Sequence, residues 1–196
     1  KISHQEKYTF STEALSIEQL FQPINNEIRE KFYDYAKHND FIEKFKGIIK
    51  GEISNFTEIK AVTHFQYKSS SFAKDHLNLF SIAKRIKSSY KRVIFFGIGG
   101  SNLGPALMND IYKNEDLDII FITGSDPDEY SSIEVTKNDA LVVSSKSFGT
   151  LETLTAYREV CGEKFYDQTF AITANGRNAN KFGIDEKNIV TFDSST

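Results

Sequence analysis

The sequence predicts an α/β protein in which a doubly wound, mainly parallel five-stranded sheet (residues 91–196) follows an N-terminal helical region (residues 1–90). Two observations carry this prediction. Short, uniformly apolar runs recur after residue 91, and such runs are typical of strands that are covered on both faces. Segments with helical character lie between some of these runs, and repeated strand–helix–strand order is typical of a parallel sheet.

The N-terminal region has the pattern of amphipathic helices. We expect helices over residues 17–37, 41–50 and 72–90, with Gly47 and Gly51 marking breaks or ends. The third is the clearest, because its apolar residues recur at steps of three and four and form one buried stripe. These residues are Phe72, Ala73, Leu77, Phe80, Ala83, Ile86 and Tyr90.

Five apolar runs bounded by Gly, Ser, Asp or Asn predict the strands of the sheet. They cover residues 93–98, 119–123, 141–144, 170–173 and 189–192. The intervening segments predict helices over residues 103–112 and 150–165, with a weaker pattern over 128–135.

Composition narrows the function classes. The net charge of −3 and the pI of about 5.9 give no overall attraction for polyanions, so we expect no nucleic-acid partner. Cys161 is the only cysteine, which excludes an intrachain disulfide and a zinc site of several thiolates. No apolar stretch is long enough to span a bilayer and the first residues do not resemble a secretion signal. We therefore expect a cytoplasmic protein without a membrane partner.

The first chemical motif, residues 97–105, follows the first predicted strand. Gly97, Gly99 and Gly100 allow the backbone to approach a ligand closely, and the following helix offers free N–H groups to an anion. A tight strand-to-helix turn without a ligand is the alternative. The motif matches the nucleotide-binding patterns only weakly. Asn102 stands where the dinucleotide fingerprint requires a third glycine, and the Gly-Lys-Ser/Thr ending of a Walker A loop is not present.

The second motif follows the third predicted strand. Ser145, Ser147 and Thr150 provide three hydroxyl groups within six residues, Lys146 adds a positive charge, and the next helix adds backbone N–H groups. Together these groups predict a phosphate site. Each hydroxyl taken alone is more often a helix cap than a ligand, but three of them around one glycine at the end of a buried strand favour binding. Glu152 lies in the first helical turn, where a negative charge is favourable without any functional role.

Both motifs resemble those of the phosphoglucose isomerase family. Residues 97–105 resemble the family's Gly-Ile-Gly-Gly-Ser-Asp-Leu-Gly-Pro element, with Asn102 in place of Asp. Residues 145–153 resemble its Ser-Lys-Thr-Phe-Thr-Thr-Gln-Glu-Thr element. Residues 55–64 resemble its Asn-x-Thr-Glu-x-Arg-Ala-Val-Leu-His stretch, so that the similarity runs from about residue 30 to the end of the chain.

The second motif departs from the family at three positions. Ser147 keeps a hydroxyl where the family has Thr, whereas Gly149 loses one and Leu151 replaces Gln. At Gly149 the sequence is similar to the broader sugar isomerase (SIS) domain group.

The resemblance implies an SIS-type sheet and a reversible aldose–ketose isomerisation of glucose 6-phosphate and fructose 6-phosphate through an enediol, as in glycolysis and gluconeogenesis. It implies a homodimer and no cofactor or metal. Carried over by position, it implies phosphate contacts from Ser145, Lys146, Ser147 and Thr150, a sugar site lined by Gly100 and Ser101, and support of a ring-opening histidine by Glu152.

Other parts of the family's machinery come later in the family's chain. These are the glutamate base, an arginine, the ring-opening histidine, a lysine, the second SIS domain and a C-terminal helical arm, and they are absent from this sequence. We therefore expect this chain alone to be inactive. Two alternatives are a non-catalytic SIS module that senses a sugar phosphate and a nucleotide-binding oxidoreductase domain. Asn102 argues against the second of these.

Overall fold

The computed structural model describes residues 8–11, 16–19, 26–55, 59–62, 77–112, 116–124, 126–162 and 164–194. Contacts between residues divide the chain into two compact units, Lys1–Val62 and Thr63–Thr196. We describe each unit by itself. Within the described ranges, none of the helices combines the length and the apolar character needed to cross a bilayer.

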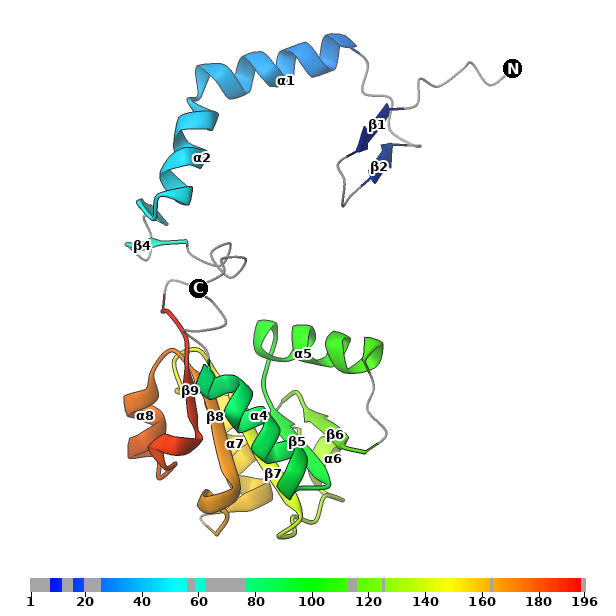
Figure 1. Ribbon diagram of the computed structural model, residues 1–196, viewed down its shortest axis with the longest axis vertical. Helices are drawn as coiled ribbons and strands as arrows, with labels where there is room; N and C mark the ends of the chain where they lie inside the picture. The colour runs from blue at the N-terminus through cyan, green and yellow to red at the C-terminus, as the bar shows by residue number, and fades with distance from the viewer. Residues whose placement is uncertain are drawn as a thin grey trace, which may run out of the picture. The chain divides into compact units, whose positions relative to one another are not determined.

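The described residues of the first unit form two helices and two small antiparallel ribbons (Figure 1). Its elements are β1 (Tyr8–Ser11), β2 (Ser16–Gln19), α1 (Asn26–His38), α2 (Phe41–Ile49), β3 (Ile53–Asn55) and β4 (Lys60–Ala61). The helix predicted over residues 41–50 is confirmed by α2. The prediction for residues 17–37 is wrong at its start, because Ser16–Gln19 pairs with β1 and the helix begins only at Asn26.

The second unit is an α/β domain built on a five-stranded sheet (Figure 1). Its elements are α4 (Leu77–Ser89), β5 (Arg92–Phe96), α5 (Gly100–Ile111), β6 (Asp118–Ile122), α6 (Pro127–Tyr130), β7 (Asp139–Ser144), α7 (Leu151–Cys161), β8 (Thr169–Thr173), α8 (Gly176–Lys181) and β9 (Ile189–Thr191). The strand order is β6-β5-β7-β8-β9 and every pairing is parallel. The predicted parallel five-stranded sheet is therefore confirmed.

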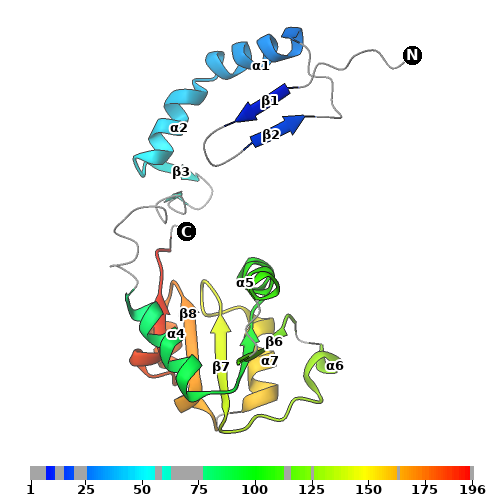
Figure 2. The same cartoon turned by 45° about the vertical axis from the view of Figure 1, so that its right-hand side comes forward.

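Helices cover both faces of this sheet. Successive side chains of a strand point to opposite faces, so each strand contributes to two separate hydrophobic clusters. On one face Ile94, Phe96 and Leu141 pack with residues of α6, α7 and α8. On the other face Val93 and Val142 pack with residues of α4 (Figure 2). Helix α4 therefore belongs to the compact unit of the sheet, and the domain limits at residues 90 and 91 stay a prediction.

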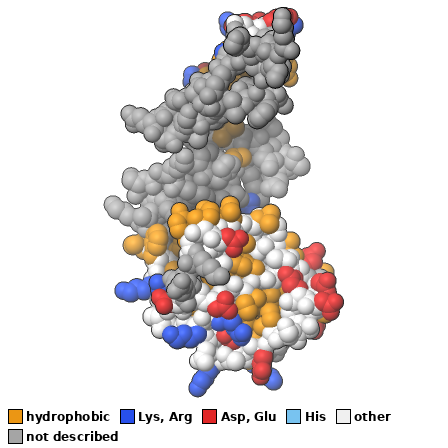
Figure 3. Space-filling model, turned by 90° about the vertical axis from the view of Figure 1, so that its right-hand side faces the viewer, with side chains coloured by type: hydrophobic (Ala, Val, Ile, Leu, Met, Phe, Trp, Pro, Cys, Tyr) orange, Lys and Arg blue, Asp and Glu red, His pale blue; other side chains and the backbone are white. Residues whose placement is uncertain are grey.

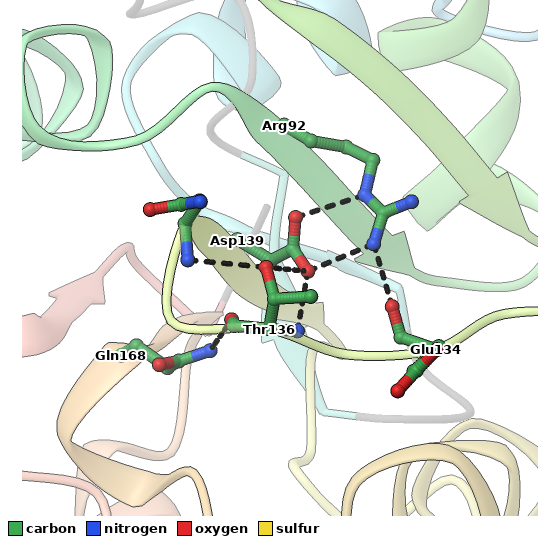
Figure 4. Close-up of polar contacts among 6 residues, drawn as sticks. Arg92, Glu134, Thr136, Asp139 and Gln168 are labelled. Carbon is green, nitrogen blue, oxygen red and sulfur yellow. Dashed lines mark hydrogen bonds and ion pairs between the residues drawn. The ribbon is translucent and has the colours of Figure 1, made fainter.

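The amino ends of β5 and β7 are joined by a polar cluster (Figure 4). Arg92 donates through Nε and one terminal nitrogen to the two carboxylate oxygens of Asp139, at 2.9 and 2.8 Å. The backbone N–H and the hydroxyl of Thr136 donate to the same carboxylate, at 2.7 and 3.1 Å. The side chain of Asp139 is buried and its charge is fully paired, so the cluster fixes the end of the sheet that lies opposite the two motifs.

The carboxyl ends of the strands carry both sequence motifs. Phe96 is opposite Val143 in the β5–β7 pairing, so the loops that follow the two strands leave the sheet side by side. Open parallel sheets bind ligands at this edge, in the crevice beyond the carboxyl ends of their strands.

Candidate functional site

The glycine motif connects β5 to α5 by a turn that requires glycine at two positions. Gly99 has φ of +54°, in the region that favours glycine. A Cβ on Gly97 would lie 2.9 Å from the carbonyl oxygen of Ser101 and 3.2 Å from the ring of Phe95. The first turn of α5 therefore packs directly on the end of the strand, which brings Gly100 and Ser101 to the edge of the sheet.

We expect Gly97→Ala to lower the free energy of unfolding by about 1–3 kcal/mol, because the added methyl group overpacks this turn. Gly100→Ala is the matched control, since a Cβ there meets no atom within 4 Å. Urea denaturation followed by circular dichroism measures both. Equal stability of the two variants would contradict the expected close packing at Gly97.

The hydroxyl motif begins with a contact between two of its predicted ligands. Ser145 Oγ lies 2.9 Å from Thr150 Oγ1, and Ser145 is 2% exposed. Thr150 occupies the N-cap position of α7, yet its side chain makes no capping hydrogen bond. The alternative explanation of Thr150 as a side-chain cap is therefore not supported, and the N–H groups of the first helical turn are left for another acceptor.

Phe148 anchors the loop between these two residues. Its backbone has φ of +47°, which is uncommon for a residue with a side chain, and its N–H donates to the carbonyl of Ser145 at 3.1 Å. The ring is buried and packs edge-to-face on Phe182, with a centroid distance of 5.6 Å. With the ring turned into the core, Lys146 and Ser147 are exposed on the outer side of the loop.

The neighbouring β8–α8 connection holds the same loop from the other side. The carbonyl of Lys146 accepts from the N–H of Ala174 at 2.9 Å and from Thr173 Oγ1 at 3.1 Å. The carbonyl of Ser147 accepts from Asn178 Nδ2 at 3.3 Å. Sequence reasoning missed these supports. The side chain of Asn175 caps α8 by accepting a hydrogen bond from the N–H of Asn178. Asn is a preferred N-cap residue, so Asn175 was the signal in the sequence that could have revealed this short helix.

The structure therefore places the sequence-predicted residues on two adjacent strand-to-helix connections, either in the loop or in the first turn of the helix that follows it. Ser145 and Thr150 contact one another, and Lys146 and Ser147 lie between them in the chain. Gly100 and Ser101 lie in the first turn of α5, and Glu152 is exposed in the first turn of α7. Their binding roles stay predictions. Of the third matching stretch, residues 56–58 and 63–64 lie outside the described residues.

Comparison with known proteins agrees on one family. A family model for phosphoglucose isomerase matches residues 81–196. A glucose-6-phosphate isomerase of Helicobacter pylori (strain J99 / ATCC 700824) is 27% identical over 95% of this chain and 41% of its own length. A glucose-6-phosphate isomerase of Corynebacterium glutamicum (strain R) is 26% identical over 95% of this chain and 42% of its own length.

A solved structure shows the same fold. The crystal structure of a glucose-6-phosphate isomerase from Chlamydia trachomatis D/UW-3/Cx matches with a TM-score of 0.67 and 20% sequence identity. The match covers 89% of this chain and 40% of that one. The chain thus spans about two fifths of the length of the relatives it matches.

Proposed function

Because the chain belongs to the phosphoglucose isomerase family, we propose that it supplies the phosphate-binding part of an enzyme that interconverts glucose 6-phosphate and fructose 6-phosphate. The observation that carries the proposal is the contact between Ser145 and Thr150, which joins the two ends of an exposed hydroxyl-bearing loop at the N-terminus of α7. This loop lies beside the glycine loop, so that a phosphate on one loop leaves the sugar within reach of the other.

The loop offers a phosphate dianion three kinds of favourable contact. Ser147 and Thr150 supply hydroxyl donors, and Lys146 supplies a positive charge at the rim. The first turn of α7 supplies backbone N–H groups and the positive end of the helix dipole. Ser145 is buried, so its role is to orient the hydroxyl of Thr150, and either hydroxyl can be the donor in their contact.

The reaction proposed for the family member opens the sugar ring and moves a proton between C1 and C2 through an enediol. In this chain Gly100 and Ser101 would line the sugar, and Glu152 would support a ring-opening histidine. The proton-transfer base and the remaining catalytic groups belong to parts of the family's chain beyond the match. We therefore expect catalysis only in a longer, dimeric and cytoplasmic protein that contains this chain.

Calorimetric titration of the 196-residue chain with fructose 6-phosphate tests the phosphate site. We expect weak binding that falls at least tenfold in Ser147→Ala/Thr150→Ala, because two hydrogen bonds to a charged group are lost. Ser131→Ala/Ser132→Ala is the matched control, because it removes two exposed hydroxyls outside both loops and should leave binding unchanged.

Two results would contradict the proposal. A folded chain that does not bind fructose 6-phosphate would mean that this part of the protein does not supply a phosphate site by itself. Equal binding by the double variant would mean that the hydroxyl assignment is wrong. The reaction is tested separately, by measuring conversion of glucose 6-phosphate by the natural protein that carries this sequence.

A further inference from the structure

One residue in the loop between Ser145 and Thr150 (the hydroxyl loop) has a backbone conformation that its own side chain disfavours. Phe148 has φ of +47°, and such a conformation persists only where the surrounding packing enforces it. The chain turns back on itself at this residue, because a Cβ on Gly149 would lie only 3.5 Å from Ser147 Oγ. The conformation of Phe148 therefore decides where the hydroxyl of Ser147 lies.

The ring of Phe148 is the part that the core can hold. Figure 3 shows that other hydrophobic side chains lie on the outside of this unit, gathered along one of its edges. The ring of Phe148 is only 3% exposed, although the residue belongs to a loop. Its aromatic partner is Phe182, which directly follows α8, with an angle of 72° between the two rings. An edge-to-face pair of this kind contributes more than the burial of its area alone.

Phe182 is itself held from several sides. Its ring packs edge-to-face on Tyr157 and Tyr166, with centroid distances of 5.5 and 6.0 Å. The guanidinium carbon of Arg158 lies 5.1 Å from the centre of the same ring. Tyr157 is fully buried, and the ring of Tyr166 lies so close to Gly183 that a Cβ there would be 3.1 Å from it. The ring of Phe182 is therefore a fixed support for its neighbours.

Helix α8 also connects Phe182 to the hydroxyl loop by hydrogen bonds. The N–H of Phe182 donates to the carbonyl of Asn178 at 3.0 Å, which ends the helix. The side chain of Asn178 donates in turn to the carbonyl of Ser147. The end of α8 thus contacts two successive loop residues, Ser147 through a hydrogen bond and Phe148 through its ring.

We propose that Phe182 is a positioning residue for the sugar phosphate: its ring keeps Phe148 turned into the core, which keeps Ser147 and Lys146 on the outer side of the loop. Phe182 does not touch the ligand. Without its ring, Phe148 leaves the disfavoured conformation in part of the molecules, and only the remaining fraction binds. The effect on binding rests on the proposed function, whereas the effect on the conformation of the loop does not.

A leucine in place of Phe182 in the 196-residue chain tests the proposal. We expect Phe182→Leu to weaken fructose 6-phosphate binding about tenfold in calorimetric titration, which corresponds to about 1.4 kcal/mol of released strain. Hydrogen exchange of the Phe148 N–H should become faster, because its bond to the carbonyl of Ser145 opens more often.

Phe170→Leu is the matched control. The ring of Phe170 also packs edge-to-face on a tyrosine, Tyr90, and also lies beneath an arginine, Arg85. It belongs, however, to the cluster on the other face of the sheet. This variant loses the same atoms and the same kinds of contact, but it should leave both the binding and the exchange of the Phe148 N–H unchanged.

A double-variant cycle tests whether the two rings act through one contact. Phe148→Leu alone should weaken binding about as much as Phe182→Leu, and adding the second change to the first should weaken it by less than about twofold more. If Phe182→Leu does not fold, Phe182→Met takes its place, since methionine keeps a long apolar side chain that adapts to the core.

Three results would overturn the proposal: natural affinity in Phe182→Leu, an equal loss in Phe170→Leu, or a second full loss when both rings are replaced. If the natural chain does not bind fructose 6-phosphate, the proposed function fails and the exchange of the Phe148 N–H decides separately. Faster exchange in Phe182→Leu but not in Phe170→Leu then supports the role of the ring in holding the loop, and unchanged exchange contradicts it.

Discussion

Phe96→Ala is expected to lower the free energy of unfolding by about 3–5 kcal/mol, the usual cost of removing a large buried aromatic side chain. Phe96 is fully buried at the centre of the larger core cluster, between the sheet and α7. Its ring packs edge-to-face on that of Tyr157 with a centroid distance of 5.5 Å, so the variant loses an aromatic contact as well as apolar burial. Urea denaturation followed by circular dichroism gives the difference.

Leu151→Ala is the control for this change. Leu151 is 70% exposed on α7, and its truncation should change stability by no more than about 0.5 kcal/mol. A loss below about 1 kcal/mol in Phe96→Ala would show that the core around β5 is not packed as described.

Arg92→Ala is expected to cost about 2–4 kcal/mol, because it leaves the carboxylate of Asp139 buried without its ion-pair partner. Asp139 is 3% exposed, and Arg92 also donates to the carbonyl of Glu134 at 2.7 Å. We place the cost below that of a fully buried pair, since the side chain of Arg92 is 29% exposed. The same urea experiment measures it.

Lys187→Ala is the matched control, because its ion pair with Asp185 is exposed on both sides. Exposed pairs contribute about 0–1 kcal/mol, so the control should be nearly neutral. Similar losses in Arg92→Ala and Lys187→Ala would contradict a special role of the buried pair.

The ion pair between Arg92 and Asp139 also predicts that the stability of the folded chain depends on pH. Burial alone would raise the pKa of Asp139, but hydrogen bonds from Arg92 and Thr136 outweigh it and hold the pKa below its ordinary value. A carboxylate with a lowered pKa stabilises the folded chain above its unfolded-state pKa of about 3.9. This stabilisation is lost as the pH falls from there through the folded-state pKa. The stability of Asp139→Asn should therefore fall less steeply below about pH 4 than that of the natural chain.

The sheet was predictable because its strands are buried on both faces. The six residues of β7 are all buried, and the run from Leu141 to Ser144 therefore appears in the sequence as uniformly apolar up to its end. The pairing of β1 with β2 was not predictable in this way. Ser16–Gln19 is a strand because it pairs with β1, and the sequence of this segment alone does not show that pairing. Short α8 was missed because six residues are too few for a helical period to be evident.

The sequence by itself determined the five strands of the parallel sheet, the helices α5 and α7 between them, the two loops at the strand ends and the resemblance that indicates a phosphate ligand. These features depend on the composition and spacing of residues that are close together in the sequence, so the sequence alone is sufficient to predict them. Only the tertiary structure decided which strands are neighbours, that the side chain of Thr150 contacts Ser145 instead of capping α7, and that Thr173 and Asn178 hold the loop that follows β7. Apart from the Ser145–Thr150 contact, which joins residues five positions apart, these features depend on contacts between residues far apart in the sequence, for which the sequence contains no local signal.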